Sequence, residues 1–217
     1  MSTRHELVVL DDEAAVARRG AEMIAEAARE AVADHGDFAM AASGGHTPWA
    51  MYGQLEEQEL PWADTAIYQV DERLAPAGSP ERNLTHLIAA LSIGAQGSLR
   101  PMPVDGADPE EGAARYSELL PLRLELAHLG LGPDGHTASL VPGDPVLEVT
   151  DRRVAVTAHA YQGTRRMTLT YPALAEAERL LWIVTGESKR EALAKLLAGD
   201  ESIPAGRVEA RESEILA

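Results

Sequence analysis

The stretch DFAMAASGGHTPWAMYGQL, residues 37–55, contains a buried strand, a tight turn and the beginning of a helix in immediate succession. Its first part, 37–42, is an apolar run of the length of a strand. The turn Ser43-Gly44-Gly45 follows, and glycine permits backbone conformations that other residues avoid. Thr47 then predicts a helix cap and Pro48 the first helical position. The stretch is therefore typical of one strand-turn-helix unit of an α/β protein.

The same alternation extends in both directions along the chain. On the amino-terminal side, ELVVL (6–10) predicts a strand, and apolar residues at helical spacing predict a helix over 11–34 that ends at Gly36. Toward the carboxyl terminus, the pattern predicts strands at 65–70, near 99–104, at 122–131 and at 179–185, β-rich segments at 152–158 and 166–170, and helices near 83–92, at 109–120, near 172–178 and at 188–199. Apolar strands separated by amphipathic helices predict a mostly parallel sheet covered on both faces.

The chain has 217 residues, a net charge of −16 and no cysteine. This length suits one α/β domain, so we expect residues 1–217 to form a single domain. No window approaches the length of a bilayer span and no secretory signal is visible, so we expect a cytoplasmic protein with no membrane partner. The absence of cysteine agrees with a reducing compartment. The acidic balance argues against a nucleic-acid partner, whereas a small anionic substrate can still bind where a few cations gather.

Ligands of parallel sheets bind outside the carboxyl ends of the strands, so the loops that follow the predicted strands are the place to search. The turn at 43–45 and the helix start after it offer free backbone N–H groups and a partial positive charge, which suit a phosphate. It is not a Walker loop, because no Gly-Lys-Ser or Gly-Lys-Thr follows. The alternative is a glycine-rich connection that binds no ligand.

Two further strand ends carry charged side chains. The strand at 65–70 leads into Asp71 and Arg73, which share one side of an extended chain. Arginine makes planar contacts to phosphate, whereas the alternative here is a surface ion pair that contributes little. The strand at 179–185 leads toward Lys189, whose ammonium group can reach an anion beside the following helix. The alternative for Lys189 is a solvated side chain.

The stretch LGLGPDGHTASL (129–140) supplies the candidate acid/base group. His136 changes protonation near neutral pH, and Asp134 can orient its ring or bias its charge. Asp134, His136 and Ser139 also suggest a hydrolase triad, but no G-x-S-x-G nucleophile turn is present. The plain alternative is a polar Pro-Asp-Gly turn. A metal site is disfavoured, because the seven histidines are scattered and no metal-binding spacing of His or Cys occurs.

Segments from all these loops resemble the glucosamine-6-phosphate isomerase/6-phosphogluconolactonase family, and its lactonase branch in particular. The matching segments, in the family's order, are ASGGHTP (42–48), VDERLAP (70–76), SPERN (79–83), LGLGPDGHTASLVPG (129–143), RMTLT (166–170) and VTGESK (184–189). The resemblance implies a three-layer α/β/α sandwich with a Rossmann-like sheet, as in sugar-phosphate isomerases. It also implies hydrolysis of 6-phospho-D-glucono-1,5-lactone to 6-phosphogluconate in the oxidative pentose phosphate pathway, a reaction that needs no cofactor.

The resemblance also implies a role for each matching residue. His136 is similar to the family's catalytic acid/base residue, and Asp134 to its support. Asp71 stands at the position of the base that abstracts a proton in the isomerase branch. The implied ligands of the substrate and its phosphate are Ser43, Gly44, Gly45, Thr47, Arg73, Arg166 and Lys189.

This chain departs from the family at two points. Before RMTLT the family usually has a proline-rich segment, and this chain has AHAYQGTR (158–165) instead. Either Arg165 or Arg166 therefore faces the site. His46 stands where lactonases often have a small polar residue, which leaves its contribution open.

Two rival functions fit parts of the same pattern. The isomerase branch deaminates glucosamine 6-phosphate, but its loop after the glycine-histidine pair usually carries a glutamate, and residues 137–142 contain none. A regulatory domain that binds sugar phosphates without catalysis normally accompanies a DNA-binding module, and no basic helix-turn-helix segment is present. We therefore expect an enzyme, acting as a monomer or a small homo-oligomer, whose partner is a small phosphorylated sugar lactone.

Overall fold

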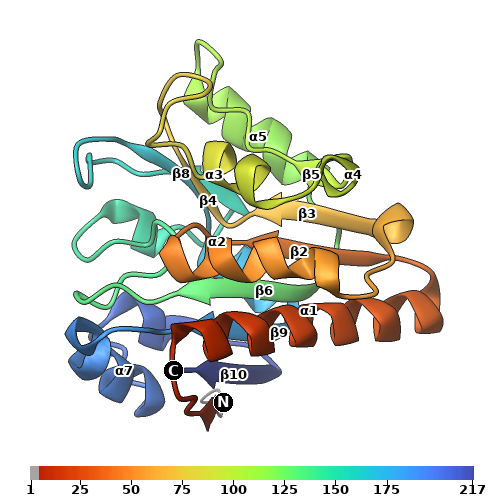
Figure 1. The fold of residues 1–217 in the computed structure, drawn as a ribbon. Coiled ribbons are helices and arrows are strands. Elements are labelled where there is room, and N and C mark those ends of the chain that lie inside the picture. Colours follow the sequence, from red (N-terminus) through yellow and green to blue (C-terminus); the bar gives the residue numbers. More distant parts are fainter. Residues whose placement is uncertain (1–4) are drawn as a thin grey trace.

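Seven parallel strands form the central sheet of the computed structural model, which describes residues 5–217 (Figure 1). Their order across the sheet is β1-β10-β9-β6-β2-β3-β5. The strands are β1 (His5–Val8), β2 (Phe38–Ala42), β3 (Thr65–Gln69), β5 (Leu99–Arg100), β6 (Leu124–Gly130), β9 (Ala177–Ile183) and β10 (Glu212–Leu216). All their carboxyl ends meet at one edge of the sheet, so the loops predicted to carry the site converge there.

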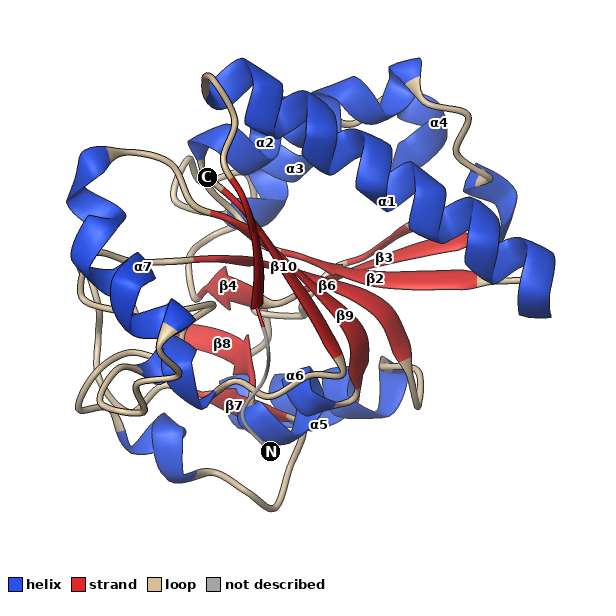
Figure 2. Cartoon of the chain, turned by 90° about the horizontal axis from the view of Figure 1, so that it is seen from below, coloured by secondary structure: helices blue, strands red, loops and turns tan. Residues whose placement is uncertain are grey.

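Helices cover both faces of this sheet, as the sequence predicts (Figure 2). On one face lie α1 (Glu13–His35), α2 (His46–Gly53), α3 (Asn83–Ala90) and α4 (Ile93–Gln96), and on the other α5 (Pro109–Leu119) and α6 (Tyr171–Ala175). The helix α7 (Arg190–Leu197) follows β9 and packs against the same core as α5 and α6. Within residues 5–217, no helix combines the length and the apolar character that crossing a membrane requires.

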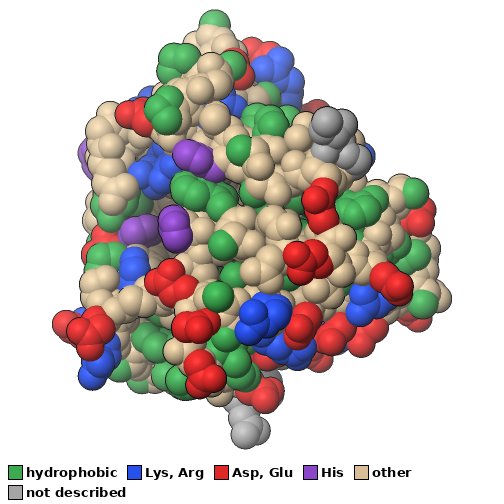
Figure 3. Space-filling model, viewed as in Figure 1, with side chains coloured by type: hydrophobic (Ala, Val, Ile, Leu, Met, Phe, Trp, Pro, Cys, Tyr) green, Lys and Arg blue, Asp and Glu red, His purple; other side chains and the backbone are tan. Residues whose placement is uncertain are grey.

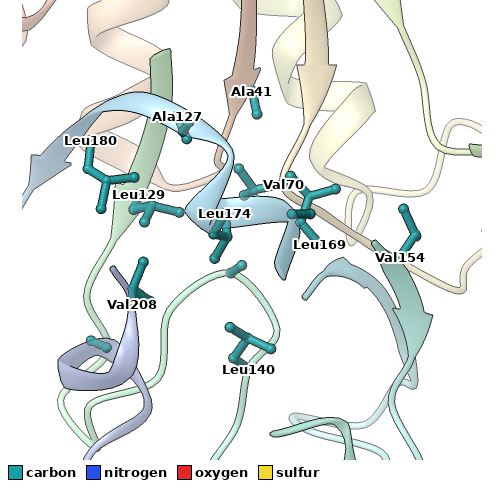
Figure 4. Close-up of a cluster of buried hydrophobic side chains, with 14 of the residues drawn as sticks. Ala41, Val70, Ala127, Leu129, Leu140, Val154, Leu169, Leu174, Leu180 and Val208 are labelled. Atoms are coloured by element: carbon teal, nitrogen blue, oxygen red, sulfur yellow. The ribbon is translucent and has the colours of Figure 1, made fainter. Parts of the chain in front are cut away.

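Two hydrophobic cores lie on the two sides of the sheet. Alternate side chains of a strand point to opposite faces, and in β9 Leu180 and Trp182 enter one core while Leu181 and Ile183 enter the other. Figure 4 shows part of the core on the α5 side, where side chains of β2, β6, β8 and β9 meet. Burial on both faces explains the almost continuous apolar runs in the sequence. The three-layer α/β/α sandwich is confirmed.

A second, smaller sheet contains β4 (Asp71–Arg73), β8 (Arg166–Leu169) and β7 (Val154–Val156) in the order β4-β8-β7. Both of its pairings are antiparallel. The sequence predicts β structure in its segments but not their pairing. In this sheet Arg73 lies opposite Arg166, which brings two charged residues of separate segments together.

Several helix ends follow from local chemistry. Asp12 caps α1 by accepting from the Ala15 N–H at 2.7 Å, and Gly36 ends that helix with a φ of 98°. Asp108 caps α5 in the same way and Pro109 occupies its first position, as predicted.

Some predicted helix and strand boundaries are wrong, because strand pairing or the lack of a proline N–H group overrides the local sequence pattern. The helix expected near 172–178 ends at Ala175, since Ala177 already pairs with Leu124 as the first residue of β9. The strand expected near 99–104 is only Leu99–Arg100, because the prolines at 101 and 103 have no N–H to donate. The strand β10 was not predicted.

Candidate active site

A cavity of about 500 Å³ opens at the carboxyl edge of the large sheet. The predicted site residues that line it are Ser43, Gly44, Gly45, Thr47, Asp71, Arg73, His136, Arg166 and Lys189. They come from the ends of β2, β4, β6, β8 and β9, which are far apart in the sequence. Figure 3 shows histidine and basic side chains gathered at the left of the molecule, where these strands end, while acidic side chains spread over the lower part of the same face.

Asp134 and His136 form a hydrogen-bonded pair at this cavity. The distance from His136 Nδ1 to Asp134 Oδ1 is 2.6 Å, and the His136 backbone N–H donates to the same oxygen at 3.2 Å. His136 lines the cavity, whereas Asp134 does not. Burial opposes ionisation of Asp134, but hydrogen bonds from His136 and Tyr161 outweigh it and lower the pKa of this carboxyl group.

Glycine makes this pair geometrically possible. A Cβ on Gly132 would overlap with the imidazole ring of His136 and with Asp134 Oδ1. Gly135 has a φ of +83°, and a Cβ there would collide with Ile203. The loop is fixed further because the Gly132 N–H donates to the His136 carbonyl at 2.8 Å.

The glycine turn and α2 form the opposite side of the cavity. The helix begins at His46 with Gly45 in the cap position, so the prediction that Thr47 caps it is wrong. The hydroxyl of Thr47 instead lies 2.9 Å from the hydroxyl of Thr185 and ties α2 to the end of β9. The first turn of α2 still faces the cavity, and the first N–H groups of a helix have no partner within it.

The two aromatic residues of α2 lie in different surroundings. Tyr52 is buried in the core, and Trp49 lines the cavity and stacks on His86 with ring centres 4.0 Å apart. His46 is exposed at the cavity mouth.

Two cations reach the cavity from the β4 and β9 ends. Arg73 follows Asp71 on the same side of β4, as predicted, and its Nη1 donates to the Glu81 carbonyl at 2.7 Å. Lys189 ends a short 3-10 turn, Glu187–Lys189, just before α7, so it precedes the helix it was expected to begin. Burial lowers the pKa of the Lys189 ammonium group, and the charge of Asp134 acts in the opposite direction.

Asp71 lies at the centre of a buried network. Its Oδ2 accepts from the Ser139 hydroxyl at 2.6 Å, and its Oδ1 accepts from Asn83 Nδ2 at 3.0 Å. Arg166 Nη1 lies 3.9 Å from Oδ2. Burial lowers the pKa of Arg166, and the charge of Asp71 opposes this effect. Both carboxylate oxygens of Asp71 are therefore engaged within the protein.

The structure separates Arg165 from Arg166. The Arg166 side chain is buried and lines the cavity, whereas Arg165 is exposed and its Nε donates to the Thr157 carbonyl at 2.8 Å. Ser139 donates to Asp71 while His136 pairs with Asp134, so these residues do not form a nucleophilic triad. Among residues 5–217, no group of three or more His, Cys, Asp or Glu side chains is placed to hold a metal ion.

Three residues at the site were missed by sequence reasoning. Glu72 is completely buried and accepts from the N–H groups of Asn83 and Leu84 at 2.7 and 2.8 Å, which fixes the start of α3 beside Asp71. Asn83 is the last residue of the SPERN segment, which could have revealed it. Tyr161 lies in the segment that departs from the family, so no family pattern pointed to it.

Comparison with known proteins agrees with this geometry. The family model described as glucosamine-6-phosphate isomerases/6-phosphogluconolactonase matches residues 11–217. A 6-phosphogluconolactonase of Synechocystis sp. is 35% identical over 182 residues, which cover 78% of this chain and 75% of the relative. One of Nostoc sp. is 32% identical over 204 residues, with 88% and 84% covered.

Solved structures share the fold. A 6-phosphogluconolactonase of Thermotoga maritima aligns with a TM-score of 0.88 at 24% identity. The alignment covers 98% of this chain and 99% of the Thermotoga chain. A monomeric glucosamine-6-phosphate deaminase has a TM-score of 0.84 at 18% identity, with 97% and 96% covered. At such identities these structures establish the architecture, while the family model and the sequence relatives establish the kinship. This chain belongs to the glucosamine-6-phosphate isomerase/6-phosphogluconolactonase family.

Proposed function

We propose that this chain hydrolyses 6-phospho-D-glucono-1,5-lactone to 6-phosphogluconate, and that residues 1–217 act as one catalytic domain. The sequence relatives named above are 6-phosphogluconolactonases. One observation carries the proposal. The cavity that contains the His136 imidazole, which is paired with Asp134, also contains Arg73, Lys189 and the glycine turn at 43–45. Such a cavity can hold a phosphate at one end and a reacting carbonyl at the other.

His136 is the general acid/base. With its Nδ1–H donated to Asp134, the neutral ring has Nε2 as the basic nitrogen, which takes a proton from the water that attacks C1 of the lactone. The new C1–O bond gives a tetrahedral oxyanion, which a backbone N–H group or a cation of the cavity wall stabilises. The bond from C1 to the ring oxygen then breaks, and the imidazolium returns the proton to that oxygen. A lactone is an activated ester, so this reaction requires no covalent enzyme intermediate.

Arg73, Lys189 and the turn at 43–47 hold the phosphate. Their contacts fix the sugar ring against His136, and this orientation lowers the entropic part of the barrier. Arg166 and Asp71 line the same cavity, with Arg166 Nη1 3.9 Å from Asp71 Oδ2. Asp71 takes an orienting role, because Ser139 and Asn83 already donate to its two oxygens. The loop after the glycine-histidine pair, residues 137–142, contains no glutamate, and this favours the lactonase reaction over the isomerase reaction.

The test is a coupled assay with freshly generated 6-phosphogluconolactone, corrected for spontaneous hydrolysis. The wild-type protein should exceed the spontaneous rate, and His136→Ala should lower kcat by roughly 10²- to 10⁴-fold with little change in KM. His159→Ala, which changes an exposed histidine that does not line the cavity, is the matched control.

Other outcomes identify the rivals. Unchanged activity in His136→Ala would end the assignment of that residue. Release of ammonia from glucosamine 6-phosphate would favour the isomerase. Tight binding of 6-phosphogluconate by a protein that does not hydrolyse the lactone would favour a sugar-phosphate sensor.

A further inference from the structure

The connection between β7 and β8 places one more side chain against the acid/base pair. Tyr161 and Thr164 face each other across a two-residue turn, with the Tyr161 N–H donating to the Thr164 carbonyl at 2.9 Å. The central residues Gln162 and Gly163 have φ values of 53° and 92°, and two positive values are typical of the tight type I′ turn. This turn fixes the backbone of Tyr161.

Arg166 holds the same turn from the side of the cavity. Its Nη2 donates to the Tyr161 carbonyl and to Gln162 Oε1, each at 3.3 Å. Its guanidinium carbon lies 5.1 Å from the centre of the Tyr161 ring. The tyrosine is thus held by its backbone and by its ring, which leaves its hydroxyl group in a defined position.

The hydroxyl group of Tyr161 meets Asp134 and His136 together. It donates to Asp134 Oδ2 at 3.1 Å, and its oxygen lies 3.3 Å from His136 Nδ1. The Tyr161 ring stands edge-on to the imidazole, with 5.1 Å between the ring centres. Tyr161 itself does not line the cavity.

We propose that Tyr161 is a positioning residue that holds Asp134, and through it the imidazole of His136. This role rests on the proposed lactonase function. Asp134 Oδ1 accepts from His136, and Tyr161 supplies the donor to Oδ2, so both oxygens of the carboxylate are fixed.

Other charged or titratable groups line the same cavity as His136. On the cavity wall they are Glu13, His46, Asp71, Arg73, Arg166 and Lys189. A phenylalanine at position 161 keeps the ring against Arg166 and His136 and leaves all these groups in place. Tyr161→Phe therefore isolates the effect of the hydroxyl group.

The experiment compares the pH profiles of kcat and kcat/KM for the wild-type enzyme, Tyr161→Phe and Tyr171→Phe. In Tyr161→Phe we expect kcat at neutral pH to fall roughly 3- to 30-fold, KM to stay within about twofold, and the pH profile to change, because the carboxylate that orients His136 is no longer fixed at both oxygens. Tyr171 loses a comparable bond, from its hydroxyl to the Pro204 carbonyl at 3.0 Å, outside the cavity. Tyr171→Phe should keep the wild-type profile.

A second variant, which displaces Tyr161 without changing it, keeps the test decisive if Tyr161→Phe does not fold. Gly163→Ala strains the turn, because φ is +92° there, and touches no other group. It should lower kcat and alter the pH profile as Tyr161→Phe does, with little change in KM.

The outcomes separate this role from the proposed function. A wild-type protein that does not hydrolyse the lactone overturns both. An active wild-type enzyme whose Tyr161→Phe and Gly163→Ala variants keep its pH profile overturns the role of Tyr161 alone.

Discussion

Gly132 leaves the space in which the imidazole of His136 lies. Its backbone is outside the left-handed region, so a side chain there is excluded by the neighbouring atoms and not by backbone strain. The atoms that a Cβ would meet are ring atoms of His136 and one oxygen of Asp134. The smallest substitution at this position therefore acts directly on the acid/base pair.

We expect Gly132→Ala to lower kcat by roughly tenfold or more, because the ring of His136 must rotate away from Asp134 and a misplaced catalytic group forfeits much of its effect. Lactone turnover measures this change, and thermal unfolding shows that the variant is folded. Gly53→Ala is the control, since the nearest atom to a new Cβ there lies at 3.7 Å and the residue is at the exposed end of α2. Wild-type kcat in Gly132→Ala would mean that the imidazole works from another position.

Contacts within one loop were predictable from the sequence, and contacts between segments were not. Asp134 and His136 are two residues apart, so their pairing is available to any tight turn that glycine allows. The contact of Asp71 with Ser139 depends on how β4 and the loop after β6 are placed in space. Thr47 illustrates the same limit, because its partner Thr185 competes with the helix cap that the local pattern favours.

At the scale of elements, His128 joins β6 to the glycine turn and to α2. It is completely buried, and its Nδ1 accepts from the Ser43 N–H at 3.3 Å and lies 2.8 Å from the Tyr52 hydroxyl. Burial lowers the pKa of His128 from 6.5 to about 3. The folded protein therefore holds this imidazole neutral at pH values where the unfolded chain binds a proton.

The sign of the linkage gives a stability prediction. Below pH 6.5 His128 binds a proton in the unfolded state but not in the folded state. The free energy of unfolding therefore decreases as the pH falls from 6.5 toward 3. Between pH 7 and 4.5 His128 should account for about 2–3 kcal/mol of this decrease, since one pKa unit corresponds to about 1.4 kcal/mol. Urea unfolding at both pH values measures it, and His128→Gln should remove that share of the pH dependence.

His159→Gln, at an exposed position, serves as the control for this experiment. An equal pH dependence in His128→Gln and the wild-type protein would show that other groups cause the loss of stability in acid.

Most elements of the large sheet were predictable, because their apolar runs and helix caps are local signals. The exceptions have particular causes. In β10, ESEIL begins with three polar residues, and only Ile215 and Leu216 are apolar, so it has no long apolar run. The small sheet depends on pairing between β4 and β8, which lie far apart in the chain, and no residue in either strand signals its partner.

At the scale of the whole molecule, a net charge of −16 surrounds a cavity that contains Arg73, Arg166 and Lys189. An anionic lactone is therefore repelled at long range and attracted at short range. The Debye length falls from about 30 Å at 0.01 M salt to about 10 Å at 0.1 M, so modest salt screens the distant charges more than the cavity contacts.

We expect kcat/KM to rise about twofold between these salt concentrations and to fall at higher ones, where the contacts to phosphate weaken. Initial rates at low substrate concentration measure the effect. NaCl and KCl should act alike, because screening does not depend on the cation. A steady fall from the lowest ionic strength would contradict this account.

The position of β1 affects how the chain is assembled during translation. Residues 5–8 pair with residues 213–216 of β10, which lies between β1 and β9. Among the strands described here, β1 is synthesised before the others but cannot enter the sheet until β10 has been made. Loops that close over so long a span are entropically costly and form slowly. The apolar face of α1 packs against β2 and α2, which follow it directly in the chain, so this part of the core can form before β1 finds its place in the sheet.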